Sequence, residues 1–409
     1  MESVKKIIVS IQLAGKELEV GELISEEKKN YFKYYASFIK TGLEISPFKL
    51  KLSDKIFVAD PIPFEGLFGV FADSLPDGWG RLLLDRTLVA KGIMIQDVTP
   101  LQRLSYVGST GMGALVYRPA MENTIHDKLK IELDAIAKEM KFVLEGSSSS
   151  VIEELYQLGG SSGGARPKIL VAYNSKTDHL IHGLDTLPNG YEHWLIKFPS
   201  SNDRKDCANI EFAYSKMALD AGIEMSECKL FSGKSSKLYF GTKRFDRSGE
   251  NKIHMQTAAG LLHDDFRLSS LDYGHIMDCA FKLENHVGAY EKILRLATFN
   301  VFAHNRDDHS KNISFLMDET GQWKMAPAYD LTFSNSSHGY QSTMVSGESR
   351  NPSKMHLMKL ANYFKIKKAN EIIQRVEESV SNWKSFAKKA GVEKDSIGLI
   401  GKKIEGILK

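Results

Sequence analysis

The chain has 409 residues, of which 42% are hydrophobic and 26% charged, as in globular proteins with a sizeable core. Its 54 Lys and Arg against 51 Asp and Glu leave a net charge of +3, too balanced to predict nucleic-acid binding by the whole chain. Glu2 argues against a secretory signal, and no apolar run approaches the roughly 18 residues that span a membrane. The three cysteines have no CxxC spacing and indicate reduced thiols, so we expect a cytoplasmic protein.

Residues 1–123 form the first predicted domain. A strand is expected at 6–13 and a strand-like aromatic run, YFKYYASF, at 31–38. Residues 61–92 look helical with a sharp interruption at LPDGWG. The glycines of VGSTGMG, at 107–113, have the wrong order for a dinucleotide site and predict a turn that leads into a strand.

A glycine-rich segment, GGSSGGARPK, occupies residues 159–168 between a predicted helix and a strand at 169–173. Its backbone N–H groups could approach a phosphate closely, although a plain linker has a similar composition. The candidate phosphate-binding residues are Ser161, Ser162, Gly163, Gly164 and Ala165.

Lys197 is the one full charge in an apolar strand, HWLIKF, at 193–198. A lysine there is costly unless it is paired. In protein kinases such a lysine holds the α- and β-phosphates of ATP and pairs with a helix Glu. Glu211, at the start of a predicted helix, is one candidate partner, and Glu192 and Asp206 are others.

A strand predicted at 238–247, LYFGTKRFDR, would end at the hinge between two lobes. The backbone at Lys243–Phe245 could bond adenine while Phe245 packs on the ring, and Gln256 is included in this candidate set. An ordinary strand end is the alternative. Residues 124–247 are therefore the second predicted domain, and 248–409 a third, mostly helical one.

The polar stretch 304–312, HNRDDHSKN, follows a predicted buried helix at 289–301. It is too rich in reactive side chains for a plain turn. A strand at 313–317, a glycine-containing turn and a return strand at 323–325 predict a β-hairpin that ends shortly before Asp330.

This order of elements matches the needs of phosphoryl transfer from ATP. That reaction uses an Asp that orients the attacking hydroxyl, an Asn on the metal ion and a second metal-binding Asp. Asp307 and Asn312 have the separation of the base and the Asn in the protein-kinase catalytic loop. Lys311 between them could contact the transferring phosphate, and Asp330 follows the hairpin. The sequence thus predicts a kinase that uses ATP and Mg²⁺.

A metal-dependent hydrolase is a competing interpretation of the same loop. His304, Asp307, Asp308 and His309 are all possible ligands of a transition metal. That interpretation leaves Lys311 and Asn312 without a role, and no second ligand cluster appears at a useful spacing, so we rank it below the kinase.

The motifs together resemble the HipA toxin-kinase family over the whole chain. The segments SLPDGWGR and VGSTGMGALVYRP are similar to its N-terminal domain, GGSSGGARPK to its phosphate loop and HWLIKFP to its ATP-lysine strand. KRFDR resembles its hinge, and NRDDHSKN and APAYD its catalytic and metal motifs. The resemblance implies an α+β fold: a protein-kinase-like pair of lobes, one small and β-rich and one large and helical, preceded by a small α/β domain.

The resemblance also implies roles. Asp307 would be the base, with His309 and Lys311 completing the loop; Asn312 and Asp330 would bind magnesium, and Lys197 the nucleotide. Ser161 aligns with a serine whose autophosphorylation silences the family's kinases.

Family members phosphorylate translation factors, notably aminoacyl-tRNA synthetases, and are restrained by a HipB-type helix-turn-helix antitoxin. No helix-turn-helix is evident in this sequence, so we expect DNA contact only through such a partner. A catalytically silent scaffold that binds antitoxin and nucleotide is the alternative from another functional class.

Overall fold

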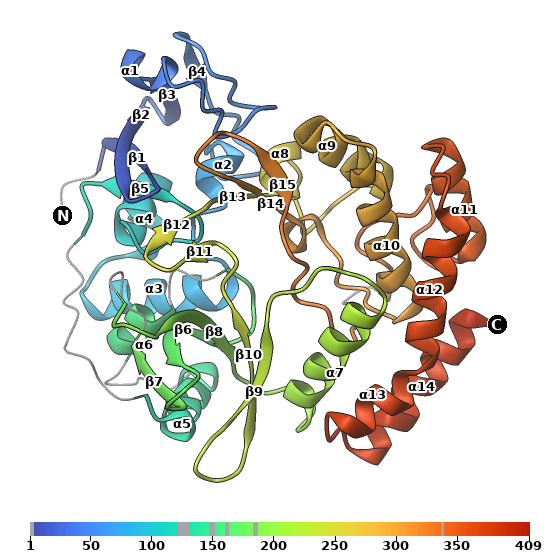
Figure 1. Cartoon of the computed structure of the whole chain (residues 1–409). Coiled ribbons are helices and arrows are strands. Elements are labelled where there is room, and N and C mark those ends of the chain that lie inside the picture. The colour runs from blue at the N-terminus through green and yellow to red at the C-terminus, as the bar shows by residue number, and fades with distance from the viewer. Residues whose placement is uncertain (1–3, 122–130, 147–151, 160–162, 183–186, 337–338) are drawn as a thin grey trace. The chain divides into compact units, whose positions relative to one another are not determined.

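The computed structural model describes residues 4–121, 131–146, 152–159, 163–182, 187–336 and 339–409 (Figure 1). Helices and strands are mixed along the chain, which confirms the predicted α+β class. The chain divides into two compact units. The first comprises residues 1–203, 231–256 and 316–321, and the second comprises 204–230, 257–315 and 322–409. The limits predicted at 123/124 and 247/248 stay predictions.

The first unit begins with a five-stranded antiparallel sheet in the order β4-β3-β2-β1-β5. Its strands are β1 (Lys6–Leu13), β2 (Lys16–Glu26), β3 (Lys29–Tyr34), β4 (Ile56–Val58) and β5 (Leu115–Arg118). Alternate β1 residues such as Val9 are buried, as the period of a half-buried strand requires. The aromatic run predicted as one strand ends at Tyr34, because the residues after it form a short helix, Ala36–Ile39.

Short helices follow this sheet in the first unit. They are α1 (Ala36–Ile39), α2 (Gly69–Ala72), α3 (Gly78–Ala90), the 3₁₀ helix η1 (Ile95–Asp97), α4 (Pro100–Val107), α5 (Leu133–Leu144) and α6 (Ile152–Gly159). The predicted interruption lies between α2 and α3. Thr99 and Gln102 form reciprocal side-chain bonds at the start of α4, which is a capping box that fixes where that helix begins.

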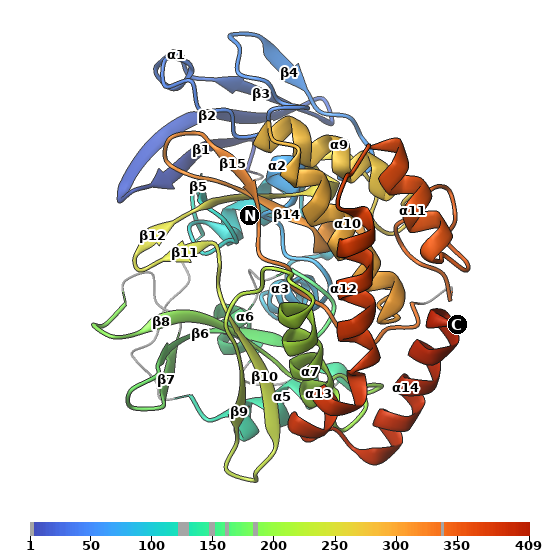
Figure 2. The same ribbon diagram turned by 45° about the vertical axis from the view of Figure 1, so that its right-hand side comes forward.

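A second sheet has the strand order β7-β6-β8-β10-β9 (Figure 2). Its strands are β6 (Lys168–Asn174), β7 (His179–His182), β8 (Glu192–Lys197), β9 (Cys228–Ser232) and β10 (Leu238–Lys243). The strand predicted to reach Arg247 stops at Lys243. The chain then forms a two-residue hairpin of β11 (Arg247–Ser248) and β12 (Asn251–Lys252).

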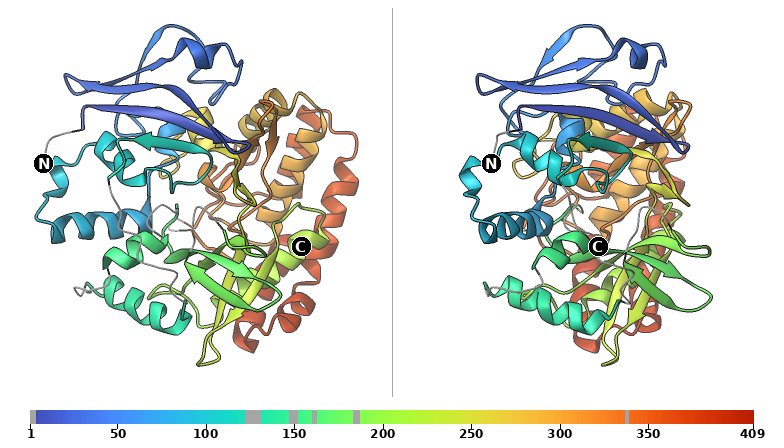
Figure 3. Two further views of the ribbon diagram at one scale, coloured as in Figure 1. Left: turned by 60° about the vertical axis from the view of Figure 1, so that its left-hand side comes forward. Right: turned by 90° about the vertical axis from the view of Figure 1, so that its left-hand side faces the viewer.

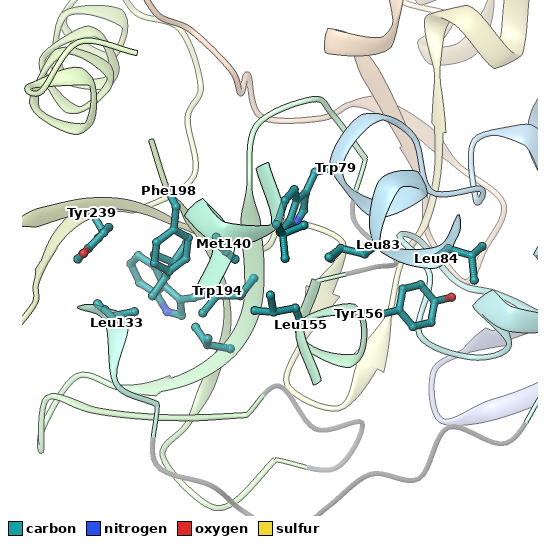
Figure 4. Close-up of a cluster of buried hydrophobic side chains, with 14 of the residues drawn as sticks. Trp79, Leu83, Leu84, Leu133, Met140, Leu155, Tyr156, Trp194, Phe198 and Tyr239 are labelled. Carbon is teal, nitrogen blue, oxygen red and sulfur yellow. The ribbon is translucent and has the colours of Figure 1, made fainter. Parts of the chain in front are cut away.

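One hydrophobic cluster joins α3, α5, α6 and this second sheet (Figure 4). Trp79 from α3, Met140 from α5 and Trp194 from β8 are each about 1% exposed and belong to the same core. Burying such large side chains contributes roughly 1.5–3 kcal/mol each. Residues on either side of position 123 therefore share one core within the first unit.

A buried ion cluster also joins the early part of this unit to residues 244–247. The Asp246 carboxylate accepts hydrogen bonds from Arg244 Nε at 2.9 Å, Arg247 Nη1 at 2.8 Å and the Gly113 amide at 2.8 Å. Burial alone would raise the pKa of Asp246, but the two guanidinium groups outweigh it and hold that pKa well below its usual range.

The second unit is mostly helical (Figure 3). Its elements, with two that begin or end in the first unit, are α7 (Cys207–Asp220), β13 (His254–Thr257), α8 (Ala258–Leu262), α9 (Tyr273–Glu284), α10 (Gly288–Phe302), the 3₁₀ helix η2 (Ser310–Asn312), β14 (Ser314–Met317), β15 (Trp323–Met325), α11 (Lys354–Tyr363), α12 (Ala369–Ser381), α13 (Trp383–Lys389) and α14 (Lys394–Leu408). Helix α10 packs against α9, α11, α12 and α14. Helices α12 and α13 are separated at Asn382. None of the described helices is long and apolar enough to cross a membrane.

We predict that Asp246→Ala lowers the free energy of unfolding by about 3–5 kcal/mol, because it strands two buried guanidinium groups. Urea unfolding measures the loss. The matched control is Glu17→Ala, which breaks the exposed ion pair with Arg118 and should cost about 0–1 kcal/mol. Equal losses in the two variants would contradict the role given to the cluster.

Candidate active site

The predicted helix and polar loop are present in the second unit, and the predicted hairpin follows them as β14 and β15. Helix α10 buries an apolar face that includes Ile293, Leu294 and Ala297, and it ends at Phe302. The loop then runs from His304 into η2 and β14. The buried helix and strand thus hold both ends of the polar loop.

Asp307, His309 and Asn312 lie together in this loop. The Asn312 side-chain amide donates to the Asp307 carbonyl at 2.7 Å, and the Asn312 backbone N–H donates to the His309 carbonyl at 2.8 Å. His309 Nε2 lies 3.7 Å from Asp307 Oδ1. The Asp307 side chain is 58% exposed, so its carboxylate is open to a substrate while its backbone is fixed.

Lys311 lies beside an aromatic residue that the sequence did not identify. Its Nζ is 5.0 Å from the centre of the Phe266 ring, within cation–π range. The His309 ring centre is 5.1 Å from that of Phe266. Phe266 thus packs against two predicted catalytic-loop residues, and the only sequence signal was an aromatic residue among charges, in HDDFR.

Asp330 follows the hairpin in a left-handed backbone conformation, with φ +56°. A non-glycine residue adopts this conformation at some cost, so the surroundings must impose it. The preceding residue supplies the constraint: the Tyr329 hydroxyl donates to the Lys311 carbonyl at 2.6 Å and lies 2.6 Å from Ser314 Oγ. The segment that carries Asp330 is therefore bound directly to the polar loop.

A buried carboxylate next to Asp307 anchors the loop. Asp308 is 2% exposed and accepts hydrogen bonds from the Tyr273 hydroxyl at 2.6 Å and from the Ser342 and Thr343 amides at 2.9 and 3.2 Å. The Thr343 hydroxyl donates to the Asp308 carbonyl at 2.6 Å. Asp307 and Asp308 therefore have opposite environments, and only Asp307 presents its carboxylate to solvent.

The network continues behind Tyr273. The Asn300 side chain on α10 donates to the Tyr273 hydroxyl at 2.9 Å, and the Asn305 side chain donates to Asn300 Oδ1 at 2.9 Å. Gln341 donates to the Asn305 carbonyl at 2.7 Å. Hydrogen bonds thus join α9 and α10 to the loop. The helical core therefore holds the loop in its conformation.

Burial raises the pKa of Asp308 to about 7, although the hydrogen bonds from Tyr273, Gln341 and the Thr343 and Ser342 amides oppose this rise. Between pH 4 and 7 the folded chain therefore binds a proton here that the unfolded chain has released.

The hydrolase interpretation required four ligands to converge, and they do not. His304 stacks on Phe333 and its Nδ1 lies 3.2 Å from the Ser334 carbonyl, while Asp308 is buried in the network just described. In the part of the chain that the structure describes, no group of three or more His, Cys, Asp or Glu could hold a metal ion.

Lys197 lies at the end of β8, in the first unit. It pairs across strands with Lys168 on β6 and Phe240 on β10, and its Nζ is 5.7 Å from the centre of the Phe240 ring. Two of its candidate partners have other contacts. Glu192 forms an ion pair with Lys243, and Asp206 accepts from Ser396 Oγ at 3.0 Å and the Glu393 amide at 2.9 Å. A pair between Lys197 and Glu211 stays a prediction.

The other nucleotide-binding candidates also lie in the first unit. Ser161 and Ser162 fall outside the described residues, whereas Gly163, Gly164 and Ala165 lie just before β6. Lys243 is the last residue of β10, and Phe245 is half-buried two residues on. Gln256 is fully buried and its side chain donates to Ser46 Oγ at 3.1 Å, so we leave it out of the nucleotide site proposed below.

We predict that Asp308→Asn changes the pH dependence of stability. The folded wild type binds the extra proton up to about pH 7, so its free energy of unfolding falls as pH rises from 4 to 7. Asn cannot ionise, so the variant should gain on the wild type over this range by up to about 4 kcal/mol. Urea unfolding at pH 5 and pH 8 measures the difference between the two proteins. A difference that does not change with pH would contradict the assignment.

Comparisons with known proteins agree with this architecture. A HipA N-terminal domain model matches residues 12–118, and a HipA-like C-terminal domain model matches residues 160–383. A search of curated proteins found no match. HipA of Shewanella oneidensis MR-1, solved with HipB and operator DNA, is 15% identical with a TM-score of 0.69, over 98% of this chain and 96% of that chain.

The Helicobacter pylori proinflammatory kinase CtkA is 12% identical over 54% of this chain and 89% of that chain. Its TM-score is 0.33. The Shewanella structure supports the fold, and the C-terminal family model covers more than half of the 409 residues. The chain therefore belongs to the HipA family.

Proposed function

We propose that the chain is a serine/threonine protein kinase of the HipA type, which transfers the γ-phosphoryl group of ATP to a serine hydroxyl of a protein. The observation that carries the proposal is the catalytic loop. Asn312 closes the loop on the Asp307 carbonyl and leaves the Asp307 carboxylate exposed. Tyr329, the neighbour of Asp330, bonds to the same loop at Lys311.

In this proposal Asp307 orients the substrate hydroxyl and accepts its proton. The hydroxyl oxygen bonds to the γ-phosphorus while the bond from that phosphorus to the bridging oxygen of ADP breaks. Lys311 neutralises charge on the transferred group, and Lys197 holds the α- and β-phosphates. Asn312 and Asp330 would bind Mg²⁺, which prefers such oxygen ligands and would neutralise the phosphate charge.

The remaining nucleotide contacts in this proposal are made by the glycine-rich loop and by residues 243–245. Backbone groups of the glycine-rich loop would approach the phosphates, because a glycine lets a ligand come close to the main chain. The backbone at Lys243–Phe245 would bond the adenine, with Phe245 against the ring. The Lys243 side chain keeps its ion pair with Glu192.

We further propose that the enzyme modifies Ser161 in its own glycine-rich loop and thereby inactivates itself. A phosphoserine adds close to two negative charges at neutral pH, which would repel the ATP phosphates. The family resemblance supports a cytoplasmic protein target such as an aminoacyl-tRNA synthetase.

A partner is proposed on the same basis. The Shewanella HipA was solved together with HipB and operator DNA. We propose that a HipB-like helix-turn-helix antitoxin binds this chain and that operator DNA is reached through the antitoxin. A near-zero net charge supports this division of roles, because strong direct DNA binding is favoured by a basic surface.

We predict that Asp307→Ala and Asp330→Ala separate catalysis from nucleotide binding. Both should lower phosphoryl transfer by about a hundredfold or more. Asp330→Ala should also remove most of the magnesium-dependent ATP affinity, whereas Asp307→Ala should keep it. Isothermal titration with ATP, with and without Mg²⁺, measures the binding, and label transfer from ATP measures the reaction.

The matched control is Glu319→Ala, which removes an exposed acid from the turn between β14 and β15, shortly before Asp330. This variant should bind Mg-ATP and transfer the phosphoryl group as the wild type does. Normal phosphoryl transfer by Asp307→Ala would show that the base is misassigned. A wild type that binds Mg-ATP without any transfer would favour the silent scaffold.

Mass spectrometry after incubation with Mg-ATP should find phosphate on Ser161 in the wild type. The Asp307→Ala variant should carry none, because the modification depends on the enzyme's own chemistry. An active wild type whose loop stays unmodified, or carries phosphate on Ser162, would overturn the assignment to Ser161.

A further inference from the structure

The described part of the glycine-rich loop is bound to the start of α3. The Trp79 amide donates to the Gly164 carbonyl at 3.1 Å, and the Gly164 amide donates to the Asp77 carboxylate. Both polar groups of Gly164 are therefore bonded to a segment whose first residue, Asp77, lies 87 positions earlier in the sequence. This segment, Asp77–Trp79, belongs to the SLPDGWGR motif, to which no catalytic or binding role has been given.

Asp77 contacts the loop and makes no cap bond to its own helix. It occupies the N-cap position of α3, where Asp normally accepts a hydrogen bond from the first turn. Here its side chain makes no such capping bond. It accepts the Gly164 N–H, so the helix forgoes a stabilising cap while the loop gains a charge-assisted bond.

The residue between Asp77 and Trp79 must be glycine for the two segments to meet. Gly78 has φ +45°, and a Cβ there would lie 2.5 Å from Ala165 Cα and 2.7 Å from the Gly164 carbonyl oxygen. Both atoms belong to the backbone and cannot turn aside as a flexible side chain could. The contact between the two segments therefore requires a glycine at position 78.

A lysine holds the loop from the strand that follows it. Lys168, which is 4% exposed, donates from Nζ to the Gly163 carbonyl. It is the first residue of β6 and pairs in register with Lys197 on β8. The loop is thus fixed between α3 and the strand pair that carries the proposed ATP lysine.

The α3 side of this contact is rigid. Trp79 is 1% exposed and packs in the cluster that contains Trp194 and Phe198 (Figure 4). Displacing Asp77 and Gly78 would therefore disturb the core of the unit.

We propose that Asp77 and Gly78 are positioning residues of the glycine-rich loop, which hold Gly163–Ala165 where the loop can bind a nucleotide phosphate. Gly164 is then the anchor of the loop, since Asp77 takes its N–H. The phosphate part of this inference rests on the proposed kinase function.

The experiment compares Asp77→Ala with Asp77→Asn, because Asn keeps an oxygen that can accept the Gly164 N–H. Hydrogen exchange in peptides that cover residues 163–168 should speed up about tenfold in Asp77→Ala and stay close to wild type in Asp77→Asn. The KM for ATP should rise about tenfold in Asp77→Ala with little change in kcat. Direct titration with ATP should show the same loss of affinity.

Two further variants act as controls. Glu65→Ala removes an exposed acid bonded to Arg81 of α3 and should leave both readouts unchanged. Gly78→Ala should loosen the loop even though every polar group is retained. If either position-77 variant melts well below the wild type, exchange in Gly78→Ala decides whether the contact holds the loop.

Wild-type exchange in both Asp77→Ala and Gly78→Ala would overturn the anchoring role. A loosened loop with unchanged ATP affinity would overturn the link to phosphate binding. A wild type that binds no ATP would refute the proposed kinase and the phosphate role together, whereas the exchange result would still decide whether Asp77 holds the loop.

Discussion

The hydrogen bonds to the buried Asp308 side chain are the interactions on which the polar loop 304–312 depends. A carboxylate in a dry environment is costly unless its oxygens are bonded, and here Tyr273 and two backbone amides supply those bonds. Because the donors come from α9 and from residues 342–343, the loop can adopt its shape only when the helical core around it is complete. The backbone of the exposed Asp307 is held by this buried neighbour, as the proposed role of Asp307 in positioning a substrate hydroxyl requires.

In the first unit, the glycine-rich loop is likewise held in place by contacts with packed elements. Backbone amides bind an anion well only when they are held in place, and a glycine-rich segment has high entropy when it is free. Asp77 and Lys168 bond the loop from two sides, and Trp79 connects the first of these contacts to the core. In each unit, contacts with rigid elements therefore hold a loop in place, as preorganised functional residues require.

Local patterns in the sequence predicted most elements because those elements depend on neighbouring residues. The helix before the loop and the strand Trp323–Met325 follow from apolar spacing and turn residues. The burial of Asp308 beside the exposed Asp307 could not be predicted, since its partner Tyr273 lies 35 positions away in the sequence. The burial of Gln256 against Ser46 depends on a contact 210 positions apart, which no local pattern contains.

Transfer of label from γ-labelled ATP to proteins of a cell extract tests the proposed kinase activity directly. The variant Lys197→Met, which keeps an apolar stem and lacks the charge, serves as the negative control. A serine/threonine kinase of the proposed kind should leave phosphoserine on extract proteins with the wild-type chain and almost none with the variant. Label that appears only as inorganic phosphate, or equal labelling by both proteins, would contradict a protein kinase built on these residues.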